Sequence, residues 1–242
     1  MRVAVISDIH ANLHALEAVL AAIERERIDA VWCLGDVVGY GPQPSRCCEL
    51  IAARADVSLA GNHDLGALGL VDLDEFSPEA AFAARWTAEA LDAEARSYLE
   101  TLRPSAETEQ AMLCHGSPRD PIWEYILSAE AALAAIEDAT RPLVLVGHSH
   151  AALAIELAED LDGGLAPEGT VVELVEGSRF LLNPGSVGQP RDGNPRAAWL
   201  LLDFARRQGS FRREPYPIGR TQAEILGAGL PESLATRLEH GV

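Results

Sequence analysis

The sequence predicts an α/β fold in which alternating strands and helices are followed by a run of strands. Before residue 151, apolar stretches of strand length alternate with stretches whose apolar residues recur at helical spacing. Beyond that point, short apolar stretches follow one another with glycine-rich turns between them. The first pattern is typical of a layered α/β domain, and the second is expected to supply a second sheet.

The helices of the first part are predicted from their apolar faces and their start signals. Leucine and isoleucine recur on one face of residues 12–27. Ser77 and Pro78 mark a helix start, because serine caps helices and proline fits their first turn. The predicted elements are strands over 2–7, 30–36, 56–64, 111–116 and 142–150, and helices over 12–27, 47–55, 78–102 and 128–139.

In the second part, residues 160–164 (DLDGG) lack the closing glutamate of a calcium loop and are predicted to form an acidic hairpin turn. A helical tail is predicted at about 220–242, interrupted at Gly229. Because no linker or repeat indicates a boundary, the chain is predicted to form a single domain over residues 1–242. The predicted strands lie over 151–158, 170–177, 178–185, 197–205 and 210–216.

Composition excludes several classes of function. The net charge is −18 and all 19 basic residues are arginine, so chemistry that needs a Schiff-base or P-loop lysine is excluded. The acidity argues against a nucleic-acid polymer as partner, because such binding needs a basic surface. No apolar run reaches the roughly 20 residues of a membrane span, and the N-terminus begins directly as a strand. We therefore expect no membrane partner and a cytoplasmic location.

Metal-competent polar residues stand at the end of each predicted strand of the first part. In layered α/β folds such strand ends gather at one ligand-binding edge. Buried carboxylates and imidazoles need a partner, and divalent transition metals supply one. The ligands suffice for two metal ions, the arrangement used to hydrolyse phosphate esters. The candidates are Asp8, His10, Asp36, Asn62, His63, His115, His148 and His150.

Two pairs in this set are close in sequence. His148 and His150 fall on the same side of an extended backbone, because side chains alternate with a period of two. Asn62 and His63 are adjacent, so on an extended chain only one of them points readily at the metals. The asparagine oxygen is then a ligand, and His63 is free to act as a general acid.

In their order along the chain, the motifs D-x-H, G-D, G-N-H-D, H-G and G-H-x-H resemble those of the calcineurin-like metallophosphoesterase superfamily. Each motif alone is weak, but five in order with a strand before each are specific. Residues 35–42 (GDVVGYGP) and 183–193 (NPGSVGQPRDG) also resemble segments of a bacterial phosphodiesterase branch. The resemblance therefore extends over nearly the whole chain.

The resemblance implies a four-layer α/β/β/α sandwich with two mixed sheets. It also implies two divalent ions, of manganese, iron, nickel or zinc, with Asp36 bridging them and His63 as proton donor. One ion is implied at Asp8, His10, Asp36 and His150. The other is implied at Asp36, Asn62, His115 and His148.

The sequence departs from the serine/threonine phosphatases of this superfamily around Asp36. Gly39 replaces the aspartate that orients the catalytic histidine there, and Tyr40 replaces an arginine. The departure argues against phosphoprotein substrates. It also leaves open what orients His63; Asp64 is next in sequence but is able to point elsewhere.

The function implied by the resemblance is hydrolysis of phosphodiesters or nucleotide-like small molecules by a metal-bridged hydroxide. Alternatives are a phosphomonoesterase, a dinucleoside-polyphosphate hydrolase, and a metal-binding scaffold without turnover. The presence of His63 favours an enzyme, because scaffolds of this superfamily tend to lack that histidine.

Three residues are candidates for substrate contact. Arg191 follows a Gly-Ser turn, and an arginine fork suits the paired oxygens of a phosphate. Tyr40 and Asn12 are weaker candidates for lining the cleft; the alternatives are a packed turn tyrosine and a helix-start asparagine. Trp123 and Tyr125 are expected to form either an aromatic wall or ordinary packing.

The apolar C-terminal helix is expected to dock on its own domain or on a second subunit, so a homo-oligomer is a further possibility.

Overall fold

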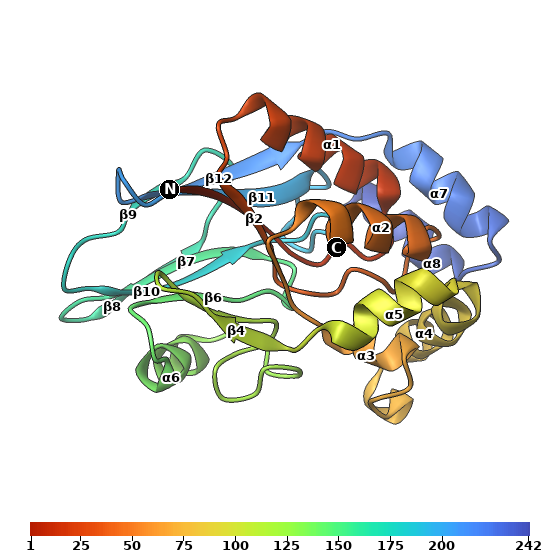
Figure 1. The fold of residues 1–242 in the computed structure, drawn as a ribbon, viewed down its shortest axis with the longest axis horizontal. Helices are drawn as coiled ribbons and strands as arrows, with labels where there is room; N and C mark the ends of the chain where they lie inside the picture. The colour runs from red at the N-terminus through yellow and green to blue at the C-terminus, as the bar shows by residue number, and fades with distance from the viewer.

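The computed structural model describes residues 1–242 and contains two six-stranded sheets (Figure 1). The first sheet has the order β3 (Val57–Ser58), β2 (Ala30–Cys33), β1 (Arg2–Ile6), β11 (Ala197–Asp203), β12 (Gln208–Glu214) and β9 (Val171–Glu173). The second has the order β4 (Ser105–Glu107), β5 (Met112–Cys114), β6 (Leu143–Leu145), β10 (Arg179–Pro184), β7 (Ala152–Leu157) and β8 (Leu161–Leu165).

Both sheets are mixed. In the first sheet β1 is parallel to β2 and antiparallel to β11. In the second, β10 is parallel to β6 and antiparallel to β7. The predicted fold class is confirmed, but the allocation of strands to sheets differs from the prediction. Three late strands, β9, β11 and β12, complete the first sheet, while β4, β5 and β6 from the first part belong to the second.

Helices cover the outer faces of the two sheets. Figure 1 shows α1 (Leu13–Arg25) and α2 (Pro44–Arg54) above the first sheet and α6 (Ala129–Asp138) below the second. The remaining helices lie at the end of the molecule beside α2. They are α3 (Asn62–Ala67), η1 (Leu73–Glu75), α4 (Pro78–Ala90), α5 (Ala93–Thr101), α7 (Ile218–Gly227), α8 (Glu232–Thr236) and η2 (Arg237–Glu239).

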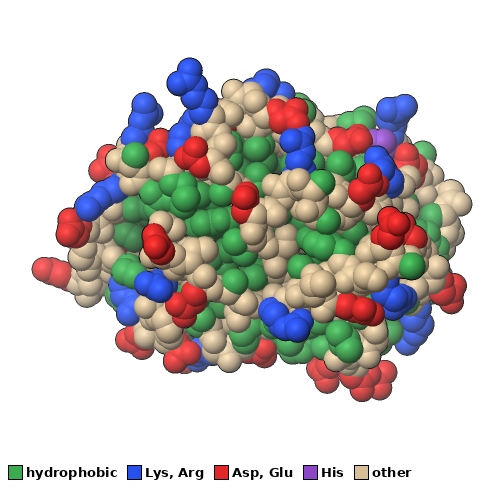
Figure 2. Space-filling model, in the orientation of Figure 1, with side chains coloured by type: hydrophobic (Ala, Val, Ile, Leu, Met, Phe, Trp, Pro, Cys, Tyr) green, Lys and Arg blue, Asp and Glu red, His purple; other side chains and the backbone are tan.

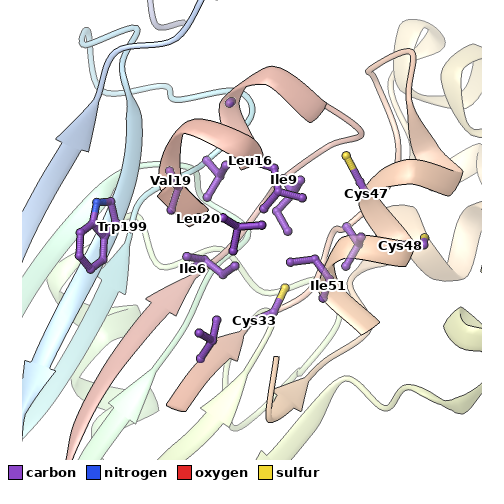
Figure 3. Close-up of a cluster of buried hydrophobic side chains, with 14 of the residues drawn as sticks. Ile6, Ile9, Leu16, Val19, Leu20, Cys33, Cys47, Cys48, Ile51 and Trp199 are labelled. Atoms are coloured by element: carbon purple, nitrogen blue, oxygen red, sulfur yellow. The ribbon is translucent and has the colours of Figure 1, made fainter. Parts of the chain in front are cut away.

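The strand period of two divides the apolar side chains between separate cores. In β1, Val3 and Val5 enter the core between the two sheets, whereas Ala4 and Ile6 face the helices. Figure 3 shows the helix side of this sheet, where Leu16, Val19 and Leu20 of α1 gather near Ile6. Since β1 is buried on both faces, it has the continuous apolar sequence expected for such a strand.

Several element boundaries differ from the predictions for local reasons. The helix predicted over 78–102 is two helices, because the side chain of Asp92 accepts a hydrogen bond from Ala95 N and starts α5. The predicted acidic turn at 160–164 is largely strand β8, which pairs with β7. The short strand β4 was not predicted. All four cysteines are buried and free.

No helix of the structure combines the length and the apolar character needed to cross a membrane.

Truncation of Leu182, which is fully buried between the sheets, tests the layered core. The Leu182→Ala variant is expected to lower the free energy of unfolding by about 2–5 kcal/mol, because it leaves a cavity. Urea unfolding with chelator present measures the change without a contribution from metal. Leu127, 74% exposed, is the control, and Leu127→Ala is expected to cost less than about 0.5 kcal/mol. Equal effects at both positions would contradict the assignment of the core.

Candidate metal centre

The backbone at the strand ends has an unusual conformation. Five of the predicted ligands, none of them glycine, have φ angles between 50° and 63°: Asp8, His10, Asp36, His148 and His150. Left-handed φ is uncommon for such residues, and strained positions of this kind gather at functional sites. The prediction that His148 and His150 share one side of an extended strand is therefore wrong. β6 ends at Leu145, and a left-handed turn at each histidine directs its side chain.

Hydrogen bonds between the loops hold these strained turns in place. Asp8 N donates to Gly35 O at 3.0 Å, and His10 N donates to Asp36 O at 3.0 Å. Gly147 N donates to His115 O at 2.9 Å. The loops after β1 and β2 are thus joined to each other, as are those after β5 and β6, so the ligands are fixed before any ion binds.

Asp8, His10, Asp36 and His150 form a first group whose ligand atoms all lie within 4.8 Å of one another. His150 Nε2 is 3.4 Å from Asp8 Oδ1, and His10 Nε2 is 3.6 Å from Asp36 Oδ2. All four residues are at most 2% exposed. The group encloses a space lined by two carboxylates and two imidazole nitrogens.

The hydrogen bonds of the two histidines in this group show that their ring nitrogens fit a cation ligand. His10 Nδ1 faces Val38 O at 3.2 Å, and His150 Nδ1 faces Gln189 O at 2.6 Å. A carbonyl only accepts, so these partners assign the proton of each neutral ring to Nδ1. Both Nε2 atoms are then lone-pair acceptors, and they face each other at 2.9 Å. Two lone pairs at that distance repel unless a cation lies beside them.

A second group contains Asp36, His115 and His148, and Asn62 adjoins it. His115 Nε2 is 3.5 Å from Asp36 Oδ2 and 3.2 Å from Asn62 Oδ1. His115 Nδ1 faces Leu34 O at 2.9 Å, which again leaves Nε2 free for a metal. His148 Nε2 is buried without a hydrogen-bond partner. The structure therefore brings all seven predicted ligands together.

Asp36 belongs to both groups. Its Oδ1 accepts a hydrogen bond of 2.9 Å from His63 N at the start of α3. Its Oδ2 is buried without a hydrogen-bond donor and lies between His10 and His115. An unpartnered carboxylate oxygen in this position fits a bridging ligand, because a cation on either side would satisfy it.

Burial controls the protonation of the cluster. It raises the pKa of Asp8 to about 7 and shifts that of Asp36 upward, with the neighbouring Asp64 adding to the second shift. The pKa of His148 is lowered to about 2, and those of His10 and His150 are lowered, in each case chiefly by burial. Neutral imidazoles are the form that binds metal. The residues therefore fit two divalent ions.

His63 lies in the first turn of α3, not at the end of a strand as predicted; β3 covers only Val57–Ser58. Helical geometry, rather than alternation along a strand, separates the directions of Asn62 and His63. Burial, with the charge of Arg191 adding to it, lowers the pKa of His63.

Aromatic packing, and not a carboxylate, orients the ring of His63. It lies 4.3 Å from the ring of Tyr40 and 5.0 Å, edge to face, from that of Phe76. Gly39 leaves room for it, since a Cβ there would lie 2.6 Å from His63 Nδ1. Asp64 points away and accepts hydrogen bonds from Val38 N and Gly61 N. Phe76 was not among the predicted residues, because nothing in its local sequence indicates a site.

The substrate-contact candidates differ in their placement. Arg191 N donates to His150 O at 3.1 Å, and Arg191 Nε is buried without a partner. Tyr40 packs on His10 and lies beneath the Arg191 guanidinium. Asn12 has the placement of the helix-start alternative, since it is 2% exposed, caps α1 and donates to Gly188 O. Tyr125 stacks on His148 at 3.8 Å.

A protein-family model described as the calcineurin-like phosphoesterase superfamily domain matches residues 1–207. The chain belongs to this superfamily. The predicted resemblance is thereby confirmed. Phosphoester hydrolysis at a dinuclear divalent-metal site is the activity of the superfamily, and the two Asp/His groups could hold such a site.

Relatives of the superfamily resemble the chain over its whole length. The crystal structure of a metallophosphoesterase from Sphaerobacter thermophilus shares 44% identity with a TM-score of 0.89, covering 100% of this chain and 99% of that one. An uncharacterized protein of Methanocaldococcus jannaschii is 37% identical over 98% of this chain and 96% of its own length. A hypothetical protein from Pyrococcus horikoshii OT3 shares the fold, with 23% identity, a TM-score of 0.81 and coverage of 100% and 98%.

Removing the charge of Asp36 is expected to weaken both metal sites. The Asp36→Asn variant should bind manganese at least about tenfold more weakly at each site, because both groups share this carboxylate. His150→Gln should weaken chiefly the first site. Calorimetric titration and elemental analysis measure the affinity and stoichiometry. His240→Gln is the control, since its side chain is 59% exposed. Loss of only one ion in Asp36→Asn would contradict a bridging role.

Metal binding is expected to release protons below neutral pH. With a pKa of about 7, Asp8 is largely protonated in the metal-free protein at about pH 6 and must ionise to bind metal. The apparent affinity therefore falls as the pH is lowered from about 7 to about 5. Calorimetry in two buffers of different ionisation heat counts the protons, and Asp8→Asn should release fewer. A binding heat that is independent of the buffer would contradict the raised pKa.

Proposed function

We propose that this chain is a phosphodiesterase-like hydrolase of small, nucleotide-like phosphoesters that uses two divalent transition-metal ions. The observation that carries the proposal is the pair of buried Asp/His groups sharing Asp36, with His63 beside them. Asp8, His10, Asp36 and His150 would hold one ion, and Asp36, Asn62, His115 and His148 the other. The ligand types suit manganese, iron, nickel or zinc.

When bound, the two ions would supply a nucleophile formed from water at neutral pH and neutralise charge on the phosphoryl group. The protein contributes the dry, fixed surroundings. Carbonyl oxygens of Leu34, Val38 and Gln189 fix three ligand rings, so little reorganisation is needed during the reaction.

His63 is proposed to donate the proton that the leaving oxygen needs. Burial and the charge of Arg191 keep the ring neutral in the free protein, and the negative charge of a bound phosphate beside it would raise its pKa, so that it carries this proton. Its ring lies 4.9 Å from that of His10, at the border of the first group, and it is 4% exposed. Tyr40 and Phe76 restrict the ring, so the proton would be delivered from one direction. Arg191 is proposed to bind non-bridging phosphate oxygens through its guanidinium fork.

The surroundings of the centre favour a diester over a phosphoprotein. Tyr125 lies on His148, and Trp123 packs edge to face on Phe76 at 5.3 Å. Tyr125 is 44% exposed, so its ring is available to a second organic substituent of the phosphate. A phosphomonoesterase and a dinucleoside-polyphosphate hydrolase are the alternative enzymes. A scaffold without turnover is the alternative outside catalysis.

Surface charge supports a small substrate rather than a nucleic-acid polymer. Figure 2 shows acidic and basic side chains interspersed over the face of the molecule that it draws, with no stripe of basic ones. A net charge of −18 repels a phosphate backbone. We further propose that the chain acts as one domain over residues 1–242 in the cytoplasm.

The test is hydrolysis by protein that has been stripped of metal and reloaded with manganese. Bis-(p-nitrophenyl) phosphate should turn over faster than p-nitrophenyl phosphate, and His63→Ala should lower kcat by about 10²–10⁴-fold through loss of the proton donor. Metal content, measured in parallel, should be unchanged in this variant. His240→Ala is the matched control and should retain full activity.

Faster turnover of the monoester would replace the diesterase proposal with a phosphatase. No turnover of either ester with two ions bound would favour the scaffold.

A further inference from the structure

A pair of arginines without carboxylate partners lies beside the candidate metal centre. Arg191 Nη2 donates to Gln189 Oε1 at 2.8 Å, and Arg237 Nη1 donates to the same oxygen at 3.3 Å. Arg191 Nη2 also lies 3.4 Å from Tyr40 Oη. Arg191 belongs to the loop after β10, whereas Arg237 begins η2 near the C-terminus. Residues far apart in sequence thus present two guanidinium groups at one point.

Arg191 and Arg237 lie together although neither has a carboxylate partner. Ten of the 19 arginines form ion pairs, among them Arg119, Arg196 and Arg213. No ion pair involves Arg191 or Arg237, and Glu79 acts on Arg237 only from beyond ion-pair distance. Two like charges on one neutral oxygen are unfavourable without an anion.

Gln189 connects the pair to the metal centre. It is 2% exposed, and its carbonyl oxygen faces His150 Nδ1 at 2.6 Å, while its side-chain oxygen holds both arginines. Both arginines are only partly buried, so a ligand is able to reach them. The carboxylates of the metal centre are those of Asp8 and Asp36, and divalent ions would bind both of them.

The arginines retain unused donor capacity. Arg191 Nε is buried without a partner, and Arg237 makes one side-chain hydrogen bond, to Gln189. Burial and the charge of Arg191 lower the pKa of Arg237, which is the expected effect of an uncompensated neighbour. Phosphate oxygens are the ligands that such forks bind best.

We propose that Arg191 and Arg237 form a site for a second phosphate group, adjacent to the phosphate that is hydrolysed. The proposal rests on the proposed function and narrows its substrates to those with two neighbouring phosphates. In this proposal Arg191 lies between the phosphate that is hydrolysed and the second, outer phosphate, and it contacts both. Arg237 contacts only the outer phosphate and is therefore a specificity-determining residue.

The test compares the binding of inorganic pyrophosphate and inorganic phosphate to manganese-loaded protein by calorimetry. Manganese is kept at the same excess in every titration. Free manganese therefore binds the same fraction of the pyrophosphate each time, and this effect cancels when variants are compared. Arg237→Gln should weaken pyrophosphate binding by about tenfold or more and phosphate binding by less than about threefold. Arg237→Lys, which keeps a cation but loses the fork, should recover only part of the lost pyrophosphate affinity.

Arg220→Gln is the matched control. It removes the same charge from an exposed position of α7 and should change either affinity by less than about twofold. Equal weakening of both ligands by Arg237→Gln, or no weakening of pyrophosphate binding, would overturn the proposal. Because binding is measured without turnover, this result is separate from hydrolysis in the nitrophenyl ester assay.

Discussion

The carboxylate of Asp36 is the group on which the rest of the site depends. It is 1% exposed, and its two oxygens make different contacts. Oδ1 accepts from His63 N and so fixes the first turn of α3, while Oδ2 faces the histidines of both groups. Gly61 must be a glycine here, because a Cβ would collide with Asp36 Oδ1. The G-D and G-N-H-D motifs are therefore two halves of one packing arrangement.

The arrangement of the ligand residues has unfavourable contributions to the free energy that bound ions would offset. Strained backbone at five ligands, buried carboxylates with raised pKa values and facing imidazole lone pairs all oppose folding in the absence of metal. The apolar core between the sheets, which includes Leu182 and Leu200, holds these groups in place. Ion binding should accordingly couple to stability.

Tyr40 links the metal centre to the C-terminal segment. Its ring packs against the rings of both His10 and His63, its hydroxyl lies near Arg191, and its ring belongs to the apolar cluster that contains Ile225 and Leu238. The left-handed φ of 57° at Tyr40 and the adjacent Gly39 make this placement possible. The tyrosine therefore positions neighbouring rings and packs against the C-terminal helices.

Much of the fold and of the candidate site could be predicted from the sequence. Apolar residues at strand spacing alternate along the chain with apolar residues at helix spacing, and this alternation predicted the α/β layers. The order of five motifs, each after a strand, predicted the superfamily and the seven metal-ligand candidates. These features are local, because the alternation of apolar residues in a strand and the identity of the residue that follows it both depend on neighbouring positions in the sequence. Two local details differ or were left open: Asn62 begins a helix rather than ending a strand, and Asn12 caps a helix, which was one of its two alternatives.

Only the tertiary structure decided which strands share a sheet, because β1 pairs with β11 across nearly the whole chain. The same holds for the contacts of Phe76 with His63 and of Gln189 with Arg191 and Arg237. Their local sequence carries no periodic or motif signal, and their roles arise from distances between segments that only folding brings together. The sequence by itself thus determined which groups perform the chemistry, and the packing of distant segments decided how those groups are oriented and which further charges lie beside them.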